Sequence, residues 1–394
     1  MQQRVDIEQL SPGMYVMEVT KQSGDIKVSS KGWVKTQVAI DALKKKGVQE
    51  VVIDPDKTLF AAEEEADEPI EETQIQAKPV SMERELGKAA KLYNEAQQLQ
   101  QKAFEDIKAG KPIDIEPVKA VTKGLIDSIF RNQDALLCMT RIREKDAYLL
   151  EHSLNVSILM SMFAKHLELD SETTEQLAVG AFLHDIGKIL IPDAILNKKG
   201  ALNPHEFEVM KSHVEHSIEI LQKTSGVSAL SLEVAAQHHE KLSGKGYPNG
   251  LNDEQISQAG RMIAIVDIYD ALTAERVYKK GMTPSSAFKL MMTMAKQDID
   301  HQLLQQFIKS IGVHPVGTLV KLSSGKLGIV IKSNNEQPLK PVVKLFYHAK
   351  YDHYTDIKDI DLAKPHCNEV IETSVKPEQF KIELNKFMRE ALLN

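Results

Sequence analysis

The chain has 394 residues, a length for which two or three domains are expected, each large enough to bury its own core. Its 49 basic and 56 acidic residues give a net charge of −7, which argues against broad electrostatic binding to nucleic acid or to an anionic membrane. There are only two cysteines without a CxxC pattern, no apolar run of roughly 18–20 residues, and no secretory signal at the N-terminus, which together predict a cytoplasmic protein.

The first 60 residues predict a small α/β domain. Short strands are expected at residues 5–7, 14–19 and 51–53. A helix is expected at residues 37–46, followed by a glycine that would end it. Residues 61–75 carry seven acidic side chains and no basic one, so we expect a solvated acidic linker over residues 61–80.

Helical patterns follow the linker, and a β pattern ends the chain. We expect a helical connector over residues 81–134 and an all-helical domain over residues 135–312. Beyond it, apolar runs around the turn signals SSGK and SNNEQP predict a small β module over residues 313–394, closed by an amphipathic helix at about 377–393. The predicted fold class is therefore multidomain and mainly α, with a small α/β domain before the helical bundle and a small β module after it.

Eight of the 13 histidines lie between residues 152 and 239. His152 and His213 each share a helix face with apolar residues four, seven or eleven positions away, so both are predicted to point inward. A lone histidine on such a face is more often a hydrogen-bonded core residue than a metal ligand. Burying two of them with further imidazoles and carboxylates nearby would be costly without a cation, which predicts a metal site built from His152, His184, Asp185, His213, His238, His239 and Asp267.

The segment AFLHDIGKI places a cation beside this site. Lys188 lies four residues after His184 and three after Asp185, so on a helix it would sit over the same pocket, where Gly187 leaves room for close approach. An ammonium group beside metal ions suits a phosphate oxygen. The alternative is a surface lysine near a helix end.

The order of these residues resembles the HD-GYP subgroup of the HD phosphohydrolase superfamily. The dipeptide His-Asp is a weak signal by itself, but the ordered set with HHEKLSGKGYP is highly specific. Ser243 in this loop departs from the family, which usually has aspartate there. The first 60 residues, with LSPGMYV and VVIDPD, also resemble an uncharacterised domain often found ahead of HD-GYP modules.

The resemblance implies a helical bundle around two or three metals that hydrolyses cyclic di-GMP to linear pGpG or onward to GMP, with a bridging hydroxide as nucleophile. By position, one metal would bind His152, His184, Asp185 and Asp267. The second would share Asp185 and bind His213, His238 and His239. Tyr148 stands where three-metal members carry glutamate, which favours a binuclear site. Iron or manganese is favoured, and zinc or nickel also suits these donors.

Asp185 and Lys188 are thus the predicted catalytic residues, and the predicted substrate contacts are Lys188, Asp270, Arg276 and Lys279. Arg276 and Lys279 match an R-x-x-K phosphate-binding pair of the family, provided that the helix carrying Asp267 bends or ends near Ala274. A solvated helix end is the alternative. Asp270 could instead orient a metal ligand or be a helix-surface acid.

The loop of Gly246, Tyr247 and Pro248 is the predicted partner site. Its tyrosine is expected to be exposed, and the family resemblance implies docking of diguanylate cyclase (GGDEF) proteins there, whereas the loop could also be a simple turn. The sequence leaves open whether the chain forms a homodimer.

Two other functions compete with this hypothesis. One is a hydrolase of the same superfamily that acts on another cyclic dinucleotide or on a nucleotide. The other is a cyclic di-GMP receptor or scaffold in which the metals are structural. No ligand position of the motif is lost in this chain, which favours the enzyme.

Overall fold

The structure is a computed structural model, which describes residues 3–11, 14–23, 32–34, 40, 43–44, 47–54, 79–141, 148–275, 280–334, 336–380 and 382. The chain divides into two compact units, Met1–Gln74 and Ile75–Asn394. Among the described residues, no helix has the length and apolarity that a membrane span requires.

The N-terminal unit contains a four-stranded antiparallel sheet in the order β1-β4-β2-β3. Its elements are β1 (Gln3–Asp6), the 3-10 turn η1 (Ile7–Gln9), β2 (Tyr15–Gln22), β3 (Gly32–Trp33) and β4 (Val48–Ile53). The apolar residues Val5, Val16 and Val51 form part of its buried core. The three expected strands overlap β1, β2 and β4, whereas most of the helix expected at 37–46 and the acidic segment 61–75 lie outside the described residues.

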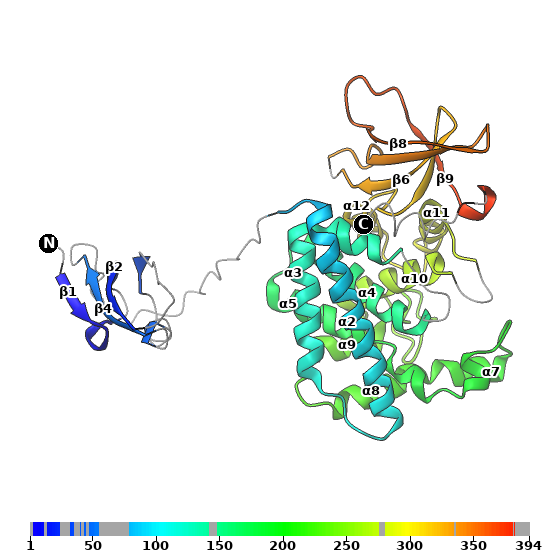
Figure 1. Cartoon of the computed structure of the whole chain (residues 1–394). Coiled ribbons are helices and arrows are strands. Elements are labelled where there is room, and N and C mark those ends of the chain that lie inside the picture. Colours follow the sequence, from blue (N-terminus) through cyan, green and yellow to red (C-terminus); the bar gives the residue numbers. More distant parts are fainter. Residues whose placement is uncertain are drawn as a thin grey trace. The chain divides into compact units, whose positions relative to one another are not determined.

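The second unit begins with a long antiparallel helix pair, α2 (Met82–Lys108) and α3 (Ile115–Met139), which lie side by side (Figure 1). The helices and one 3-10 turn that follow are α4 (Tyr148–His166), α5 (Ser171–Leu183), η3 (Ile186–Leu190), α6 (Asp193–Leu196), α7 (Pro204–Lys211), α8 (His213–Lys223), α9 (Ala229–Gln237), α10 (Gln258–Thr273), α11 (Pro284–Met294) and α12 (His301–Ile311). The mainly helical character expected for this region is confirmed.

Helix α4 forms the centre of the helical unit. It contacts α3, α5, α10 and α12, and residues on all its faces, among them Leu154, Val156 and Ile158, are fully buried. Side-chain caps fix where three helices of this unit begin: Asp170, Ser228 and Ser257 accept main-chain N–H groups at the starts of α5, α9 and α10. Polar side chains on α4 therefore face protein on every side and need partners there.

A five-stranded antiparallel sheet in the order β8-β7-β6-β5-β9 forms the C-terminal module, at one end of the helical unit (Figure 1). Its strands are β5 (Leu319–Leu322), β6 (Lys326–Lys332), β7 (Val342–His348), β8 (His353–Asp361) and β9 (Ile371–Ser374). Ser333 donates hydrogen bonds from its N–H and hydroxyl to the buried carboxylate of Asp134 on α3, which attaches the module to the helices.

The three apolar runs of the sequence correspond to β5, β6 and β7, and the predicted β module is confirmed. The polar edge strand β8 was missed because its mostly exposed side chains give no apolar alternation. Of the helix expected at 377–393, the described part forms the 3-10 turn η4 (Pro377–Phe380), and residues 383–394 lie outside the description.

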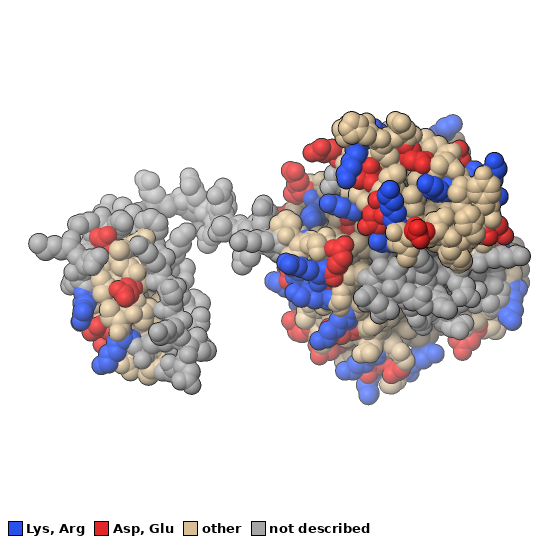
Figure 2. All heavy atoms as spheres, turned by 45° about the horizontal axis from the view of Figure 1, so that its top comes forward, with Lys and Arg blue, Asp and Glu red and all other residues tan. Residues whose placement is uncertain are grey.

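Acidic and basic side chains alternate over the face of the helical and C-terminal unit that Figure 2 draws, without a continuous basic area among the coloured residues. This distribution agrees with the net charge of −7. A cation on this face therefore acts locally, through its own contacts, and not as part of a wide basic field.

Candidate metal centre

Seven candidate donors converge in the core of the helical unit from five separate places in the chain. His152 lies on α4, His184 and Asp185 join α5 to η3, His213 opens α8, His238 and His239 follow α9, and Asp267 lies on α10. Six of them are buried, and His239 retains 25% of its side-chain exposure. The structure thus brings together every predicted ligand position.

Two groups of donors are close enough to hold a metal ion each. In the first, ligand atoms of His152, His184 and Asp185 lie within 4.8 Å of one another. Asp267 joins this group, because its Oδ1 lies 3.0 Å from Nε2 of His152 and 3.9 Å from Nε2 of His184.

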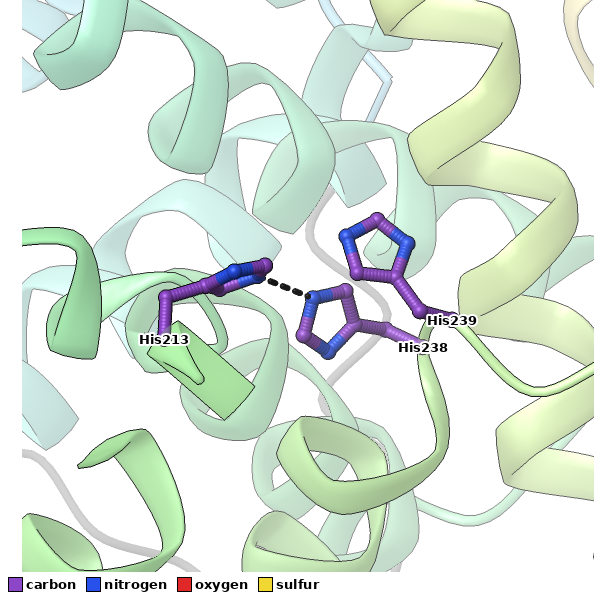
Figure 3. A group of neighbouring side chains, drawn as sticks. All are labelled: His213, His238 and His239. Carbon is purple, nitrogen blue, oxygen red and sulfur yellow. Dashed lines mark hydrogen bonds between the residues drawn. The ribbon is translucent and has the colours of Figure 1, made fainter. Parts of the chain in front are cut away.

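The second group consists of His213, His238 and His239, whose ligand atoms also lie within 4.8 Å of one another (Figure 3). The Nε2 atoms of His213 and His238 are 3.3 Å apart. Asp185 connects the two groups: its Oδ1 is 3.3 Å from Nε2 of His213, and its Oδ2 is 3.5 Å from Nε2 of His152.

The hydrogen bonds of three histidines determine which ring nitrogen carries the proton. Nδ1 of His184, His213 and His238 lies 2.7, 2.6 and 2.7 Å from the main-chain oxygens of Ala181, Met210 and Ala235. A carbonyl oxygen can only accept, so each Nδ1 is the donor, and in the neutral ring Nε2 keeps a lone pair. This second hydrogen bond is the arrangement typical of metal-binding histidines.

These three lone pairs point at a carboxylate. Nε2 of His184, His213 and His238 lies 3.4, 3.3 and 3.6 Å from the Asp185 oxygens. Nε2 of His184 and Oδ1 of Asp185 are fully buried and have no hydrogen-bond partner of acceptable geometry. Acceptors facing acceptors in a dry site repel one another unless a cation lies between them, so the donor set fits divalent metal ions.

The protonation states support the same interpretation. Burial lowers the pKa of His184 to about 3, so its ring is neutral at pH 7. Burial also lowers the pKa of His213 and, more strongly, of His239. Although burial opposes ionisation of Asp185, the charge of Lys188 holds the pKa of that carboxyl well below its usual range. The rings of His184, His213 and His239 are therefore neutral beside an anionic Asp185.

Asp270 lies behind His152 in the fully buried interior. Its Oδ2 accepts a hydrogen bond from Nδ1 of His152 at 2.8 Å, which turns Nε2 of that ring toward Asp185 and Asp267. Burial alone would lower the pKa of His152, but its hydrogen bonds to Asp267 and Asp270 raise it to about 9. The prediction that Asp270 contacts substrate is therefore wrong, and the alternative of an orienting carboxylate fits this geometry.

Lys188 reaches Asp185, as predicted, through a different local structure. Helix α5 ends at Leu183, and Lys188 lies in the 3-10 turn η3, with its ammonium on Oδ2 of Asp185. The room expected at Gly187 is filled by protein: a Cβ there would stand 2.1 Å from the main-chain oxygen of His213. Gly187 therefore allows η3 to pack directly on the start of α8.

Glu240 holds the Gly-Tyr-Pro loop against the metal centre. Both carboxylate oxygens of buried Glu240 accept main-chain N–H groups, from Asn249 at 2.8 Å and Leu251 at 2.9 Å. Tyr247 is half-buried, and its ring packs on His239 with centroids 4.7 Å apart. The expectation of an exposed tyrosine is therefore wrong, because the ring is turned inward. The role of Glu240 was missed, although it follows two ligands directly in HHE.

The serine that departs from the family pattern also lies in this loop. The Ser243 hydroxyl donates to Oδ1 of Asp298 at 2.7 Å, and the ammonium of Lys241 lies 3.1 Å from Oδ2 of the same carboxylate. The turn thus has an acid beside it, supplied by a different segment, which agrees with the departure being tolerated.

Three predicted positions are not placed by the structure. Arg276 and Lys279 lie outside the described residues, and so does the side chain of Tyr148 at the start of α4. Helix α10 does end where the R-x-x-K hypothesis requires, at Thr273, and Ala274 that follows is extended.

Comparison with known proteins divides the chain into three matched regions. Residues 131–303 match the HD domain, residues 2–118 a domain of unknown function (DUF3391), and residues 319–382 the KOW domain associated with the HD domain. The HD match contains all seven donors, and the DUF3391 match extends through α2 into the start of α3.

Among curated proteins, the chain is 35% identical over 358 residues to cyclic di-GMP phosphodiesterase PA4108 of Pseudomonas aeruginosa, covering 89% of this chain and 86% of that protein. It is 32% identical to a cyclic di-GMP phosphodiesterase of Thermotoga maritima, over 46% of this chain and 50% of that protein. It is also 35% identical to 3'3'-cGAMP-specific phosphodiesterase 3 of Vibrio cholerae, over 43% of this chain and 37% of that protein.

Proposed function

The chain belongs to the HD-GYP family of HD-domain phosphodiesterases, and on that premise we propose that it hydrolyses cyclic di-GMP at a centre of two divalent metal ions. One observation carries the proposal: three histidine lone pairs and an ammonium converge on the single buried carboxylate of Asp185. That carboxylate belongs to both donor groups, so it suits the bridging position of a paired centre.

The donors divide into two sets around Asp185. His152, His184 and Asp267 with Asp185 would hold one ion, and His213, His238 and His239 with Asp185 would hold the other. When bound, the two ions supply an activated water and stabilise the charge that develops on the phosphoryl oxygens. Nitrogen and oxygen donors without thiolate suit iron or manganese, and also zinc or nickel.

The chain's own residues prepare the site for a phosphodiester. Asp270 fixes the ring of His152, and the main-chain oxygens of Ala181, Met210 and Ala235 fix three others. Lys188, on the bridging carboxylate, adds a positive charge at the same place, which suits a charge-assisted hydrogen bond to a phosphate oxygen.

Cyclic di-GMP is the substrate favoured by the Pseudomonas aeruginosa relative, of which the chain covers 86%. Relatives specific for 3'3'-cGAMP match over less than half of this chain, so that dinucleotide is the second candidate. We propose the loop of Gly246, Tyr247 and Pro248 as the docking site of a GGDEF partner, with its exposed neighbours Lys245 and Asn249 as the accessible side chains.

Turnover separates the enzyme from a receptor with structural metals. The purified full chain is loaded with iron or manganese and mixed with cyclic di-GMP or 3'3'-cGAMP, with a chelated sample as control. We expect hydrolysis of cyclic di-GMP that is lost on chelation. Binding of cyclic di-GMP without hydrolysis in every metal-loaded form would favour the receptor. Faster hydrolysis of 3'3'-cGAMP than of cyclic di-GMP would make 3'3'-cGAMP the assigned substrate.

Metal stoichiometry and product identity test the paired centre. Because a phenol with its usual pKa near 10 is a poor replacement for a carboxylate at neutral pH, Tyr148 does not complete a third site. We expect two metal ions per chain by elemental analysis and accumulation of linear pGpG. Three ions per chain, or GMP formed as fast as pGpG, would contradict the paired centre.

A further inference from the structure

Two aromatic rings and one cation border the second histidine group, and none of them is needed as a metal ligand. We call Phe207 and Lys211 of α7 and Tyr247 of the Gly-Tyr-Pro loop the aromatic cluster. The Phe207 and Tyr247 rings are 6.4 Å apart between centroids and inclined by 82°. Nζ of Lys211 lies 5.5 and 5.8 Å from these two centroids. Because Tyr247 packs on His239, the cluster is continuous with the metal donors.

Phe207 presents an open aromatic face. It keeps 47% of its surface exposed on α7, which Figure 1 shows at the edge of the helical unit. The unit contains one useful comparison, Phe130, which is 38% exposed and has Nζ of Lys165 4.9 Å from its ring centroid. Lys165 is 13 residues beyond His152 on α4, about 20 Å along the helix, so that second pair is remote from the centre.

The cluster is held in place before any ligand binds. Helix α7 starts with a capping box between Asn203 and Glu206, which fixes the helix that carries Phe207. The Tyr247 N–H donates to the main-chain oxygen of His239 at 3.2 Å. At Gly246 a Cβ would stand 2.5 Å from Cα of Glu240, so the loop packs backbone to backbone on the residue that anchors it.

Both polar groups of the cluster can serve a ligand as donors. Within the described part of the chain the Tyr247 hydroxyl makes no hydrogen bond, and a phenol keeps its proton at neutral pH. The Lys211 ammonium pairs with Glu208 at 2.8 Å, which leaves two of its three N–H groups. An aromatic face flanked by donors suits a flat base with acceptors along its edge.

We propose that the aromatic cluster binds one nucleobase of the substrate, stacked on Phe207, with Lys211 and the Tyr247 hydroxyl donating to its edge. The inference rests on the proposed function, because it assigns a role to the substrate's base. Guanine presents two neighbouring acceptors, N7 and O6, whereas adenine has an amino donor in place of O6. The Lys211 ammonium, which can only donate, therefore favours guanine over adenine.

Leucine and tryptophan at position 207 test the stacking. Phe207→Leu keeps an apolar side chain on α7 but removes the flat ring, so we expect the KM for cyclic di-GMP to rise about tenfold with kcat changed less than twofold. That ratio corresponds to about 1.4 kcal/mol, within the range for a base stacked on an aromatic ring. Phe207→Trp should restore the KM, and Phe130→Leu, the matched control, should leave it unchanged.

Lys211→Met tests the selection of guanine, and its result can be interpreted whatever the Phe207 variants show. Inhibition constants of cyclic di-AMP and of unhydrolysed cyclic di-GMP analogues are compared in the metal-loaded full chain. We expect the preference for guanine to narrow at least fivefold in the variant, because the edge donor is lost while the stem is kept. An unchanged preference would overturn the role of Lys211.

The outcomes separate this inference from the proposed function. Turnover by the unaltered chain with an unchanged KM in Phe207→Leu overturns the base site and leaves the proposed function intact. A chain that turns over no cyclic di-GMP in any metal-loaded form overturns both. Metal content is measured in every variant, so that a raised KM with both ions present is assigned to substrate binding.

Discussion

Gly187→Ala should damage the metal centre through packing alone. Gly187 carries no chemistry, but a Cβ built there would stand 2.1 Å from the His213 main-chain oxygen and 2.5 Å from the Ser217 nitrogen. Ordinary contact begins at 3.4 Å, so η3 and α8 must separate by about 1 Å or more. The shift moves His213 away from Asp185, because the crowded oxygen belongs to the ligand residue itself.

Two magnitudes follow from this displacement. Overpacking of this kind lowers the free energy of unfolding by about 1–3 kcal/mol. Misplacing a catalytic group by about 1 Å can reduce turnover about a hundredfold. We therefore expect a lower Tm, a reduced metal content and a kcat lower by about two orders of magnitude.

The assay compares Gly187→Ala with Gly87→Ala on α2, where an added Cβ meets nothing within 4 Å. The control replaces glycine inside a helix, so its stability should stay the same or rise by about 0.5–1 kcal/mol, with normal turnover. Thermal unfolding, elemental analysis and cyclic di-GMP turnover are measured on both variants. Normal metal content and turnover in Gly187→Ala would refute the packing argument.

Three further substitutions test the surroundings of the ligands. Asp270→Asn keeps an oxygen for Nδ1 of His152 but removes the negative charge, so metal affinity or turnover should fall about ten- to a hundredfold. An unchanged metal affinity in titrations would contradict the orienting role. Lys188→Ala should keep both metal ions and lower kcat/KM about ten- to a hundredfold, because a hydrogen bond to a charged phosphate oxygen is lost. Loss of metal from this variant would mean that the role of Lys188 is misassigned. Glu240→Gln places an amide donor against one of two main-chain donors, so the KM should rise with the metals retained, and an unchanged KM would argue against the anchored loop.

Periodicity and motif order were sufficient to predict the helical unit and the inward-facing histidines. His152 and His213 are each 1% exposed, as their apolar neighbours indicated. A helical spacing argument also placed Lys188 near Asp185, although the local structure is a 3-10 turn, because three residues bring a side chain back to one face in either helix. Which side chains share a helix face depends only on their spacing along the chain, so it can be predicted from the sequence.

The features that sequence reasoning missed depend on tertiary packing. Asp270 lies three residues after Asp267 on the same helix, a spacing that could have indicated its role, but its partner His152 comes from a helix more than a hundred residues earlier. Packing on His239 turned Tyr247 inward, and the space at Gly187 is filled by α8. Phe207 stood out only once its exposure and its neighbours were known.

Asp185→Ala tests the central claim most directly, because both donor groups meet on that one carboxylate. Metal content and cyclic di-GMP turnover are measured on the same metal-loaded sample of the full chain, beside the unaltered protein. The paired centre predicts loss of both metal ions and of hydrolysis together. Full occupancy of two ions with near-normal turnover in Asp185→Ala would contradict it.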